Sequence, residues 1–142
     1  MLVIGWKEYI DFPEWNLRRV KVKIDTGART SALGVVSYKL REAGVAGLVA
    51  QLHLAPYRKR PDRLTVVEVP VLRMVVVSNS SGMREQRPLI ETTLRLGSVT
   101  KRVPLTITNR ASMLFPLILG RKVLEGDFVV DVSKKYLLKR SG

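Results

Sequence analysis

The stretch VKIDTGART, residues 22–30, places a carboxylate where a strand pattern stops. The run before Asp25 alternates apolar residues with lysine, and Thr26, Gly27 and Ala28 follow it as a turn signal. Two carboxylates in contact share one proton, so one accepts a proton from water while the other donates to a carbonyl oxygen. In such a site the Thr26 hydroxyl would fix the turn, and Gly27 would admit a close backbone. Turn chemistry alone also explains the triplet, because Asp and Gly are ordinary turn residues.

Other catalytic chemistries have few candidates in this sequence. There is no cysteine, and the one histidine, His53, lies in the alternating stretch VAQLHLA, where we interpret it as an exposed or edge-strand residue. The usual zinc sets, an H-E-x-x-H motif and a phosphate-binding loop are absent, so we predict no metal and no cofactor. No further aspartate stands in a second D-T-G context; the other candidate carboxylates are Asp11, Asp62, Asp127 and Asp131.

The elements that must position Asp25 are mostly strands, and we predict one all-β domain over residues 1–142. Gly97 and Ser98 indicate a hairpin turn, SNSSG at 78–82 is a second turn signal, and residues 55–63 look like a polar excursion. A short helix is predicted over Arg121–Glu125, with Gly126 as its C-cap. Runs rich in β-branched and leucine residues predict the strands, at 20–24, 45–54, 64–77, 89–96, 99–108 and the FVVDV segment.

A second segment, FPLILGRKVLEG at residues 115–126, gives the aspartate its context. D-T-G-A followed much later by apolar-apolar-Gly-Arg and a helix resembles the retropepsin-like aspartic proteases. The matching residues are Ile118, Leu119, Gly120 and Arg121, which in that family form a ψ-shaped loop across the aspartate turn. KIDTGARTSAL, REQRPLIETTLRLG and TNRASMLFPLILGRKVLEGDFVVDVSKKYL narrow the resemblance to the bacterial and archaeal branch, often labelled ATP-dependent zinc proteases. Residues 40–64 have no clear match, and the sequence supports neither the zinc nor the ATP of that label.

The resemblance implies a closed or nearly closed all-β barrel with one short helix near the C-terminus. It also implies a homodimer, because one chain supplies one Asp25 and the catalytic pair needs two. By analogy the terminal segments Leu2–Ile4 and Tyr136–Leu138 would join the subunits. A hairpin flap over the substrate is expected at Val75–Pro88, alternatively a plain surface hairpin. Its tip would comprise Ser78, Asn79, Ser80, Ser81, Gly82 and Met83.

Two positions depart from related sequences. Gly34 stands where members of the branch usually have His. Arg29 follows D-T-G-A where viral retropepsins have an acid, so the viral pairing of that acid with the arginine after the second glycine is not available to Arg121. We expect Arg121 to pair with Asp127 or Asp131, or to lie at the surface.

The net charge of the chain indicates which binding partners it would attract. The chain carries 25 Lys+Arg against 12 Asp+Glu, a formal net charge of +13. We interpret the basic clusters mainly as a solvated face that would also favour acidic peptides, with nucleic-acid binding as a less favoured alternative. No leader or membrane-spanning stretch is recognised, so a soluble cytoplasmic protein without membrane partners is expected. The predicted function is aspartic peptide hydrolysis by an Asp25 dyad; the alternative is a catalytically inactive peptide-binding module on the same fold.

Overall fold

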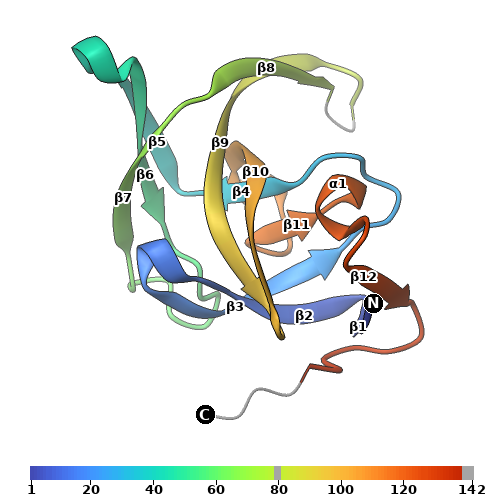
Figure 1. The fold of residues 1–142 in the computed structure, drawn as a ribbon. Coiled ribbons are helices and arrows are strands. Elements are labelled where there is room, and N and C mark those ends of the chain that lie inside the picture. The colour runs from blue at the N-terminus through green and yellow to red at the C-terminus, as the bar shows by residue number, and fades with distance from the viewer. Residues whose placement is uncertain (79–80, 139–142) are drawn as a thin grey trace.

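The computed structural model describes residues 1–78 and 81–138, and strands dominate this part of the chain (Figure 1). One short α-helix, α1 (Arg121–Leu124), follows strand β11, and the short 3-10 turns are η1 (Pro13–Trp15), η2 (Gly44–Ala46) and η3 (Arg110–Ser112). The strands are β1 (Leu2–Gly5), β2 (Lys7–Phe12), β3 (Leu17–Ile24), β4 (Ala32–Val35), β5 (Ser37–Glu42), β6 (Leu48–Leu54), β7 (Thr65–Pro70), β8 (Arg73–Ser78), β9 (Arg84–Leu96), β10 (Val99–Asn109), β11 (Leu117–Leu119) and β12 (Phe128–Asp131).

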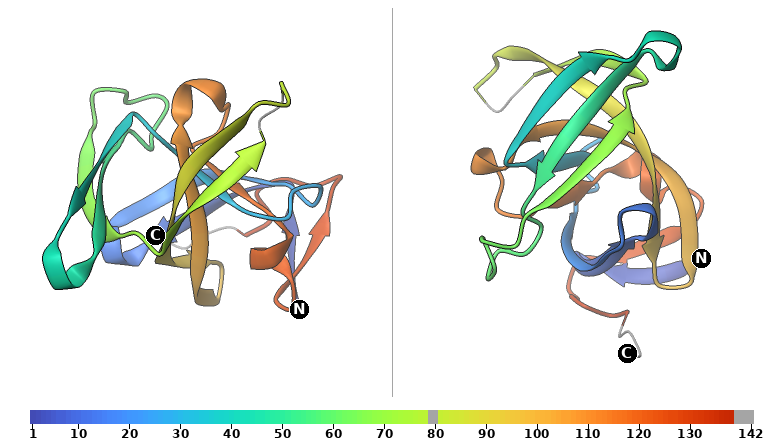
Figure 2. Two further views of the ribbon diagram at one scale, coloured as in Figure 1. Left: turned by 90° about the horizontal axis from the view of Figure 1, so that it is seen from above. Right: turned by 90° about the vertical axis from the view of Figure 1, so that its left-hand side faces the viewer.

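A seven-stranded sheet with the order β10-β4-β11-β3-β2-β9-β8 positions the candidate site. β9 also pairs with β10, from Leu96↔Val99 to Leu89↔Thr106, so two distant members of that order are joined by one long hairpin. β11 lies parallel to β3 and antiparallel to β4. A separate three-stranded sheet, β5-β6-β7, stands to one side of the molecule, at the left of Figure 1 and of the left-hand view of Figure 2.

The core follows from the alternation of apolar side chains along the strands. On β3, Val20, Val22 and Ile24 are buried while Lys21 is exposed and Lys23 half-buried, as the sequence predicts. Each fully buried aliphatic side chain of this kind contributes roughly 1.5–3 kcal/mol relative to its exposed state. The buried faces of β9 and β10 complete the same core with Ile90, Leu94, Leu96, Val103, Leu105 and Ile107.

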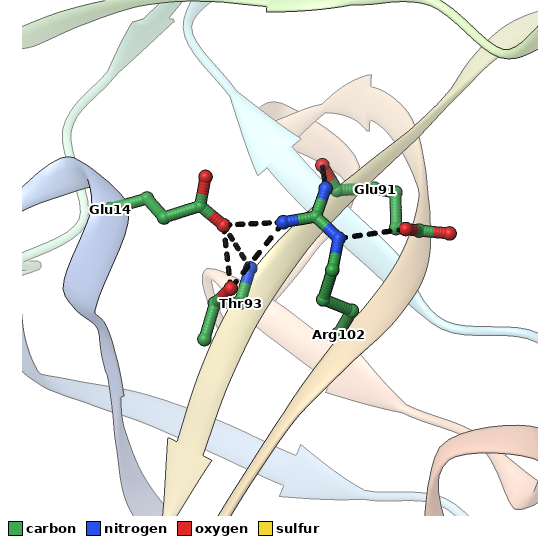
Figure 3. Close-up of polar contacts among 4 residues, drawn as sticks. All are labelled: Glu14, Glu91, Thr93 and Arg102. Atoms are coloured by element: carbon green, nitrogen blue, oxygen red, sulfur yellow. Dashed lines mark hydrogen bonds and ion pairs between the residues drawn. The ribbon is translucent and has the colours of Figure 1, made fainter.

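A surface network fastens η1 to the β9–β10 hairpin (Figure 3). Glu14 Oε1 accepts hydrogen bonds from the Thr93 hydroxyl at 2.6 Å, the Thr93 N–H at 2.9 Å and Arg102 Nη1 at 2.7 Å. Arg102 Nε also donates to Glu91 Oε1 at 2.8 Å. The Thr93 hydroxyl, followed by its N–H and Arg102, lowers the pKa of Glu14, and the Glu91 carboxylate raises the pKa of Arg102.

Several predicted elements are confirmed, and one predicted strand is divided. The hairpin at Gly97–Ser98 forms with Gly97 at φ 61°, and the helix forms at Arg121 with Gly126 at φ 84° just after it. The predicted strand 64–77 is instead β7 and β8, separated by residues 71 and 72. Val71 N–H donates to Leu48 and Leu72 N–H to Leu89, so the chain passes here from the small sheet to the large one.

The terminal segments find partners within their own chain. β1 pairs in parallel with β12, from Leu2↔Phe128 to Gly5↔Asp131. The fully buried Glu8 carboxylate accepts N–H groups from Gly5 at 2.8 Å, Leu137 at 2.9 Å and Leu138 at 3.3 Å. In the described residues no helix is long and apolar enough to cross a bilayer.

Candidate active site

Asp25 directly follows the end of β3. Hydrogen bonds to its backbone and to its side chain hold it there. Its N–H donates to the Leu119 carbonyl at 2.9 Å, which places the turn against β11. Its Oδ1 accepts the Gly27 N–H at 3.0 Å, and its carbonyl accepts the Ala28 N–H at 3.2 Å. Asp25 is half-buried, and these bonds fix its carboxylate in a tight Asx-type turn.

The ψ-loop residues cross directly over this turn. The Arg121 N–H donates to the Ala28 carbonyl at 2.8 Å, and the Lys122 N–H donates to the Arg29 carbonyl at 3.1 Å. A Cβ added at Gly120 would lie 2.5 Å from the Thr30 oxygen and 2.7 Å from the Ala28 oxygen. Only glycine fits there without moving backbone, which explains why the Gly of the apolar-apolar-Gly motif is required.

Arg121 is exposed, which is one of the predicted alternatives, and its side chain contacts the backbone of the turn. Its Nη1 donates to the Thr26 carbonyl at 3.0 Å, so its partner is backbone and not a carboxylate. Asp127 instead accepts Lys101 Nζ at 2.6 Å, and Asp131 accepts the Ser133 N–H and hydroxyl, which lower the Asp131 pKa. Thr26 thus contributes its carbonyl oxygen to this contact, and the role predicted for its hydroxyl stays a prediction.

Two polar residues that the sequence did not single out support the crossing. Ser31 is 2% exposed, and its Oγ accepts the Gly120 N–H at 2.9 Å. The Ser31 carbonyl in turn accepts the Thr106 N–H at 3.0 Å and the Thr106 hydroxyl at 3.1 Å. Both residues are buried, and buried polar groups in proteins have hydrogen-bond partners. In the sequence, the available signal for this role was a polar residue at a position expected to be buried.

The β8–β9 hairpin reaches across the same region (Figure 1). Ser78 pairs with Arg84, which confirms the predicted hairpin, while Asn79 and Ser80 of the predicted tip lie outside the described residues. A cleft of about 530 Å³ lies between the hairpin, residues 30–31 and α1, and neither Asp25 nor the ψ-loop residues 118–121 line it. Its lining includes Thr30, Ser31, Val75, Val77, Lys122 and Val123.

Gly34 lies apart from the Asp25 turn, on β4. A Cβ there would come within 2.9 Å of Met113 Sδ and 3.1 Å of the Arg110 Cα. Gly34 lines a separate cleft together with Arg110 and Met113. The absent side chain is replaced by the close approach of the η3 segment, so a larger residue at this position requires η3 to shift.

The remaining candidates have structural partners. Asp11 is 3% exposed and accepts the Arg19 N–H at 3.0 Å and Arg95 Nη2 at 3.2 Å. His53 lies on β6, the central strand of its sheet and not an edge strand, half-buried and bonded to Gln51 at 3.0 Å. In residues 1–78 and 81–138, no group of three or more His, Cys, Asp or Glu side chains is arranged to hold a metal.

This fold and the crossing of the D-T-G turn by the ψ-loop define a retropepsin-like protein. The chain belongs to the RimB-like family, whose profile, described as retropepsin-like aspartic endopeptidase RimB, matches residues 3–141.

Two proteins of related sequence and one crystal structure are similar to this chain. The chain is 33% identical over 132 residues to a probable alpha-L-glutamate ligase of Desulfotalea psychrophila, covering 91% of this chain and 28% of that protein. It is 30% identical over 141 residues to a probable alpha-L-glutamate ligase of Shewanella pealeana, covering 99% and 30%. The chain thus spans less than a third of these relatives' length. A crystal structure of a Legionella pneumophila protein of unknown function shares the fold, with a TM-score of 0.78 at 22% identity, covering 97% and 98% of the chains.

Proposed function

We propose that this protein is an aspartic-type endopeptidase that works as a homodimer. A water held between Asp25 carboxylates of two subunits attacks the peptide carbonyl, with one carboxylate accepting the water proton and the other donating to the carbonyl oxygen. The observation that carries the proposal is the crossing of the Asp25 turn by Gly120 and Arg121, at contacts too close for any side chain at position 120. This crossing holds the carboxylate rigidly, as a positioned general base requires.

Each remaining part of the proposal rests on a particular feature. Family membership supports a peptidase, and the ring of strand pairings through β9 and β10 supports the closed barrel of the retropepsin type. The β8–β9 hairpin is suited to be the flap, with Ser78–Met83 at its tip, and the 530 Å³ cleft beneath it suits substrate side chains. The net charge of +13 and the glutamate ligases among the relatives favour acidic, glutamate-containing peptides.

The test compares cleavage of a mixed peptide library, with glutamate-rich members, by the wild type and by Asp25→Asn. Loss of cleavage is expected, because an amide cannot accept the proton from water. Asp62→Asn, the same change at an exposed carboxylate in the loop between β6 and β7, is the matched control and should cleave like the wild type. Equal cleavage by wild type and Asp25→Asn would show that Asp25 is not catalytic.

Light scattering tests the dimer separately. A dimer at micromolar concentration is expected, because a single chain contains one D-T-G and the mechanism needs two. A chain that stays monomeric while it cleaves peptides would contradict the two-subunit dyad.

A second candidate is a non-catalytic module that binds extended peptides by strand addition. It is favoured by β8, which ends the seven-stranded order and, among the described residues, pairs on one side only with β9. An added peptide strand would place its side chains over the cleft below the hairpin. Peptide binding by both wild type and Asp25→Asn, with no cleavage by either, would favour this module over the peptidase.

A further inference from the structure

A second cleft, away from the β8–β9 hairpin, is lined by cations and aromatic rings. Its volume is about 440 Å³, and no carboxylate lines it. We call it the basic cleft, defined by its five cationic residues, Lys7, Arg19, Lys21, Arg58 and Lys59. Among the described residues, no ion pair neutralises any of these five side chains.

Ring contacts take the place of ion pairs in the basic cleft. The Arg19 guanidinium lies 4.5 Å from the centre of the Tyr9 ring, and Lys7 Nζ lies 4.5 Å from the Trp6 ring and 5.6 Å from the Phe115 ring. Aromatic faces attract cations without cancelling their charge, in contrast to a carboxylate. The side chains are thus oriented and remain able to bind an anion.

An unusual backbone conformation at Arg19 places its side chain against Tyr9. Strand β3 shifts register against β2 between Ile10 and Phe12, and Arg19 in this irregular stretch adopts φ 54°. A non-glycine residue in the left-handed region is uncommon and is stabilised here by the Asp11 carboxylate, which accepts the Arg19 N–H. The bulge therefore directs the guanidinium onto Tyr9.

Two distant segments are tied onto this bulge to complete the basic cleft. The Tyr57 hydroxyl donates to the Arg18 carbonyl at 2.6 Å and accepts the Arg18 N–H at 3.3 Å, which brings the loop bearing Arg58 and Lys59 to β3. From the C-terminal side, the Tyr136 ring stacks on Tyr9 at 4.7 Å. The cleft is thus assembled from three parts of the chain by specific contacts.

The five cations around this concave surface repel one another. A cleft lined by positive charge also focuses its electric field on an approaching anion. The contacts also indicate which polyanion fits. The Tyr9 ring already contacts the Arg19 guanidinium and the stacked Tyr136 ring, so it is engaged within the chain and is a poor platform for a nucleic-acid base. Tyr57 likewise has Arg63 over one face at 5.0 Å. Carboxylates need only the N–H groups of the cations. Arg58 already donates one, from Nη1, to the Leu114 carbonyl at 3.2 Å, while the Lys21 and Lys59 side chains are exposed.

The basic cleft and the candidate active site are connected along the chain by β3. Lys21 on β3 is four positions before Asp25, which directly follows the strand, a span of about 13 Å in extended chain, and the alternation of β3 puts Lys21 and Lys23 on the same outward face. Pro116, which lines the cleft, directly precedes β11 and the ψ-loop. An extended peptide at Asp25 therefore reaches the cleft within a few residues.

We propose that the basic cleft is an exosite that binds a run of carboxylate side chains in the polypeptide substrate, several residues away from the bond that is cut. The proposal rests on the proposed peptidase function for its role, while its binding is measurable without cleavage. The ligand class is an acidic peptide, bound by charge-assisted hydrogen bonds from lysine and arginine.

The experiment measures binding of fluorescein-labelled hexaglutamate to the full chain carrying Asp25→Asn, by fluorescence anisotropy. The double variant Lys21→Gln/Lys59→Gln in that background is expected to raise Kd on the order of fivefold, because two exposed charges that contact the ligand are removed. Lys39→Gln/Lys134→Gln removes two charges from exposed positions outside the cleft, and is the matched control with unchanged Kd. At about 1 M salt, where the Debye length is about 3 Å, binding is expected to be lost.

Each outcome separates the exosite from the peptidase. Equal weakening by both double variants would reduce the effect to overall charge and overturn the exosite. Equal binding of hexaglutamine, or tighter binding of a single-stranded oligonucleotide that displaces hexaglutamate, would overturn the acidic-peptide assignment. Hexaglutamate binding at the cleft with no cleavage by the wild type would remove the peptidase and leave the exosite standing; cleavage of glutamate peptides with no binding at the cleft would do the reverse.

Discussion

The Asp25 turn and the basic cleft are adjacent along β3 but are held together in different ways. At the turn, the contacts that matter are backbone bonds and near contacts of glycine: Asp25 N–H to Leu119, Arg121 N–H to Ala28, and Gly120 against two carbonyl oxygens. In the cleft, side chains rest on rings, as Arg19 does on Tyr9. The first arrangement fixes one carboxylate in one place, and the second presents many exposed cations that remain able to adjust.

The rigid turn suits a carboxylate that would react at one bond. The adjustable cations of the cleft suit a ligand whose shape varies. A general base must lie within hydrogen-bond reach of one proton, so small displacements are costly. A charged exosite tolerates movement because Coulomb attraction changes gradually with distance. Substitutions at the turn are therefore expected to cost more stability than substitutions at the cleft.

Gly120→Ala is expected to have the largest effect. The added Cβ would lie 2.5 Å from the Thr30 oxygen and 2.7 Å from the Ala28 oxygen, so backbone of one segment must move. Overpacking of this kind against backbone costs about 3 kcal/mol. Urea unfolding measures it, and Gly27→Ala is the matched control, since its Cβ would meet only the Asp25 carboxylate oxygen at 3.2 Å. Equal stability of the two variants would contradict a backbone-built turn.

Ser31→Ala is expected to follow. It leaves the buried Gly120 N–H without the Ser31 hydroxyl, which accepts it at 2.9 Å, at a cost of about 1–2 kcal/mol. Urea unfolding again gives the free energy. Ser37→Ala, at an exposed position at the start of β5, should leave stability unchanged. A loss no larger than that of the control would show that the hydroxyl is not part of the brace.

Tyr136→Ala tests the cleft side of the comparison. It removes the ring stacked on Tyr9 at 4.7 Å, and a stacked pair of this kind contributes about 0.5–1.5 kcal/mol beyond the area it buries. A fall in stability, together with weaker hexaglutamate binding, is expected. Tyr136→Phe keeps the stack and is the control. If Tyr136→Phe weakened stability as much as Tyr136→Ala, the ring contact would not be the cause.

Glu14→Gln is expected to have the smallest effect, since the network in Figure 3 is exposed. Because the Thr93 hydroxyl lowers the folded-state pKa of Glu14, the network contributes stability above the usual value of about 4.5 and loses it as pH falls through the lower folded value. The wild type should thus be slightly more stable than Glu14→Gln near neutral pH, and the difference should disappear in acid. Thermal unfolding from neutral to acid pH measures this stability difference. A difference that grew in acid would contradict a lowered folded-state pKa of Glu14.

Much of the fold was predictable because it follows from local pattern. The β3 face of Val20, Val22 and Ile24 is buried as its alternation predicts, and Gly97 makes the turn that its type favours. What was not predictable depends on contacts between segments. β2 was missed because it carries Lys7, Glu8 and Asp11, and Glu8 is buried only because distant N–H groups of Leu137 and Leu138 satisfy it.

By itself the sequence determined that Asp25 ends a strand in a D-T-G turn and that an apolar-apolar-Gly segment follows it far along the chain, since strand and turn preferences act between neighbouring residues. The meeting of those segments, the Arg121 contact with Thr26, and the Ser31 and Thr106 brace were decided only by the tertiary structure. The same is true of the five cations that line the basic cleft, because burial, hydrogen-bond satisfaction and like-charge placement depend on residues that only folding brings together.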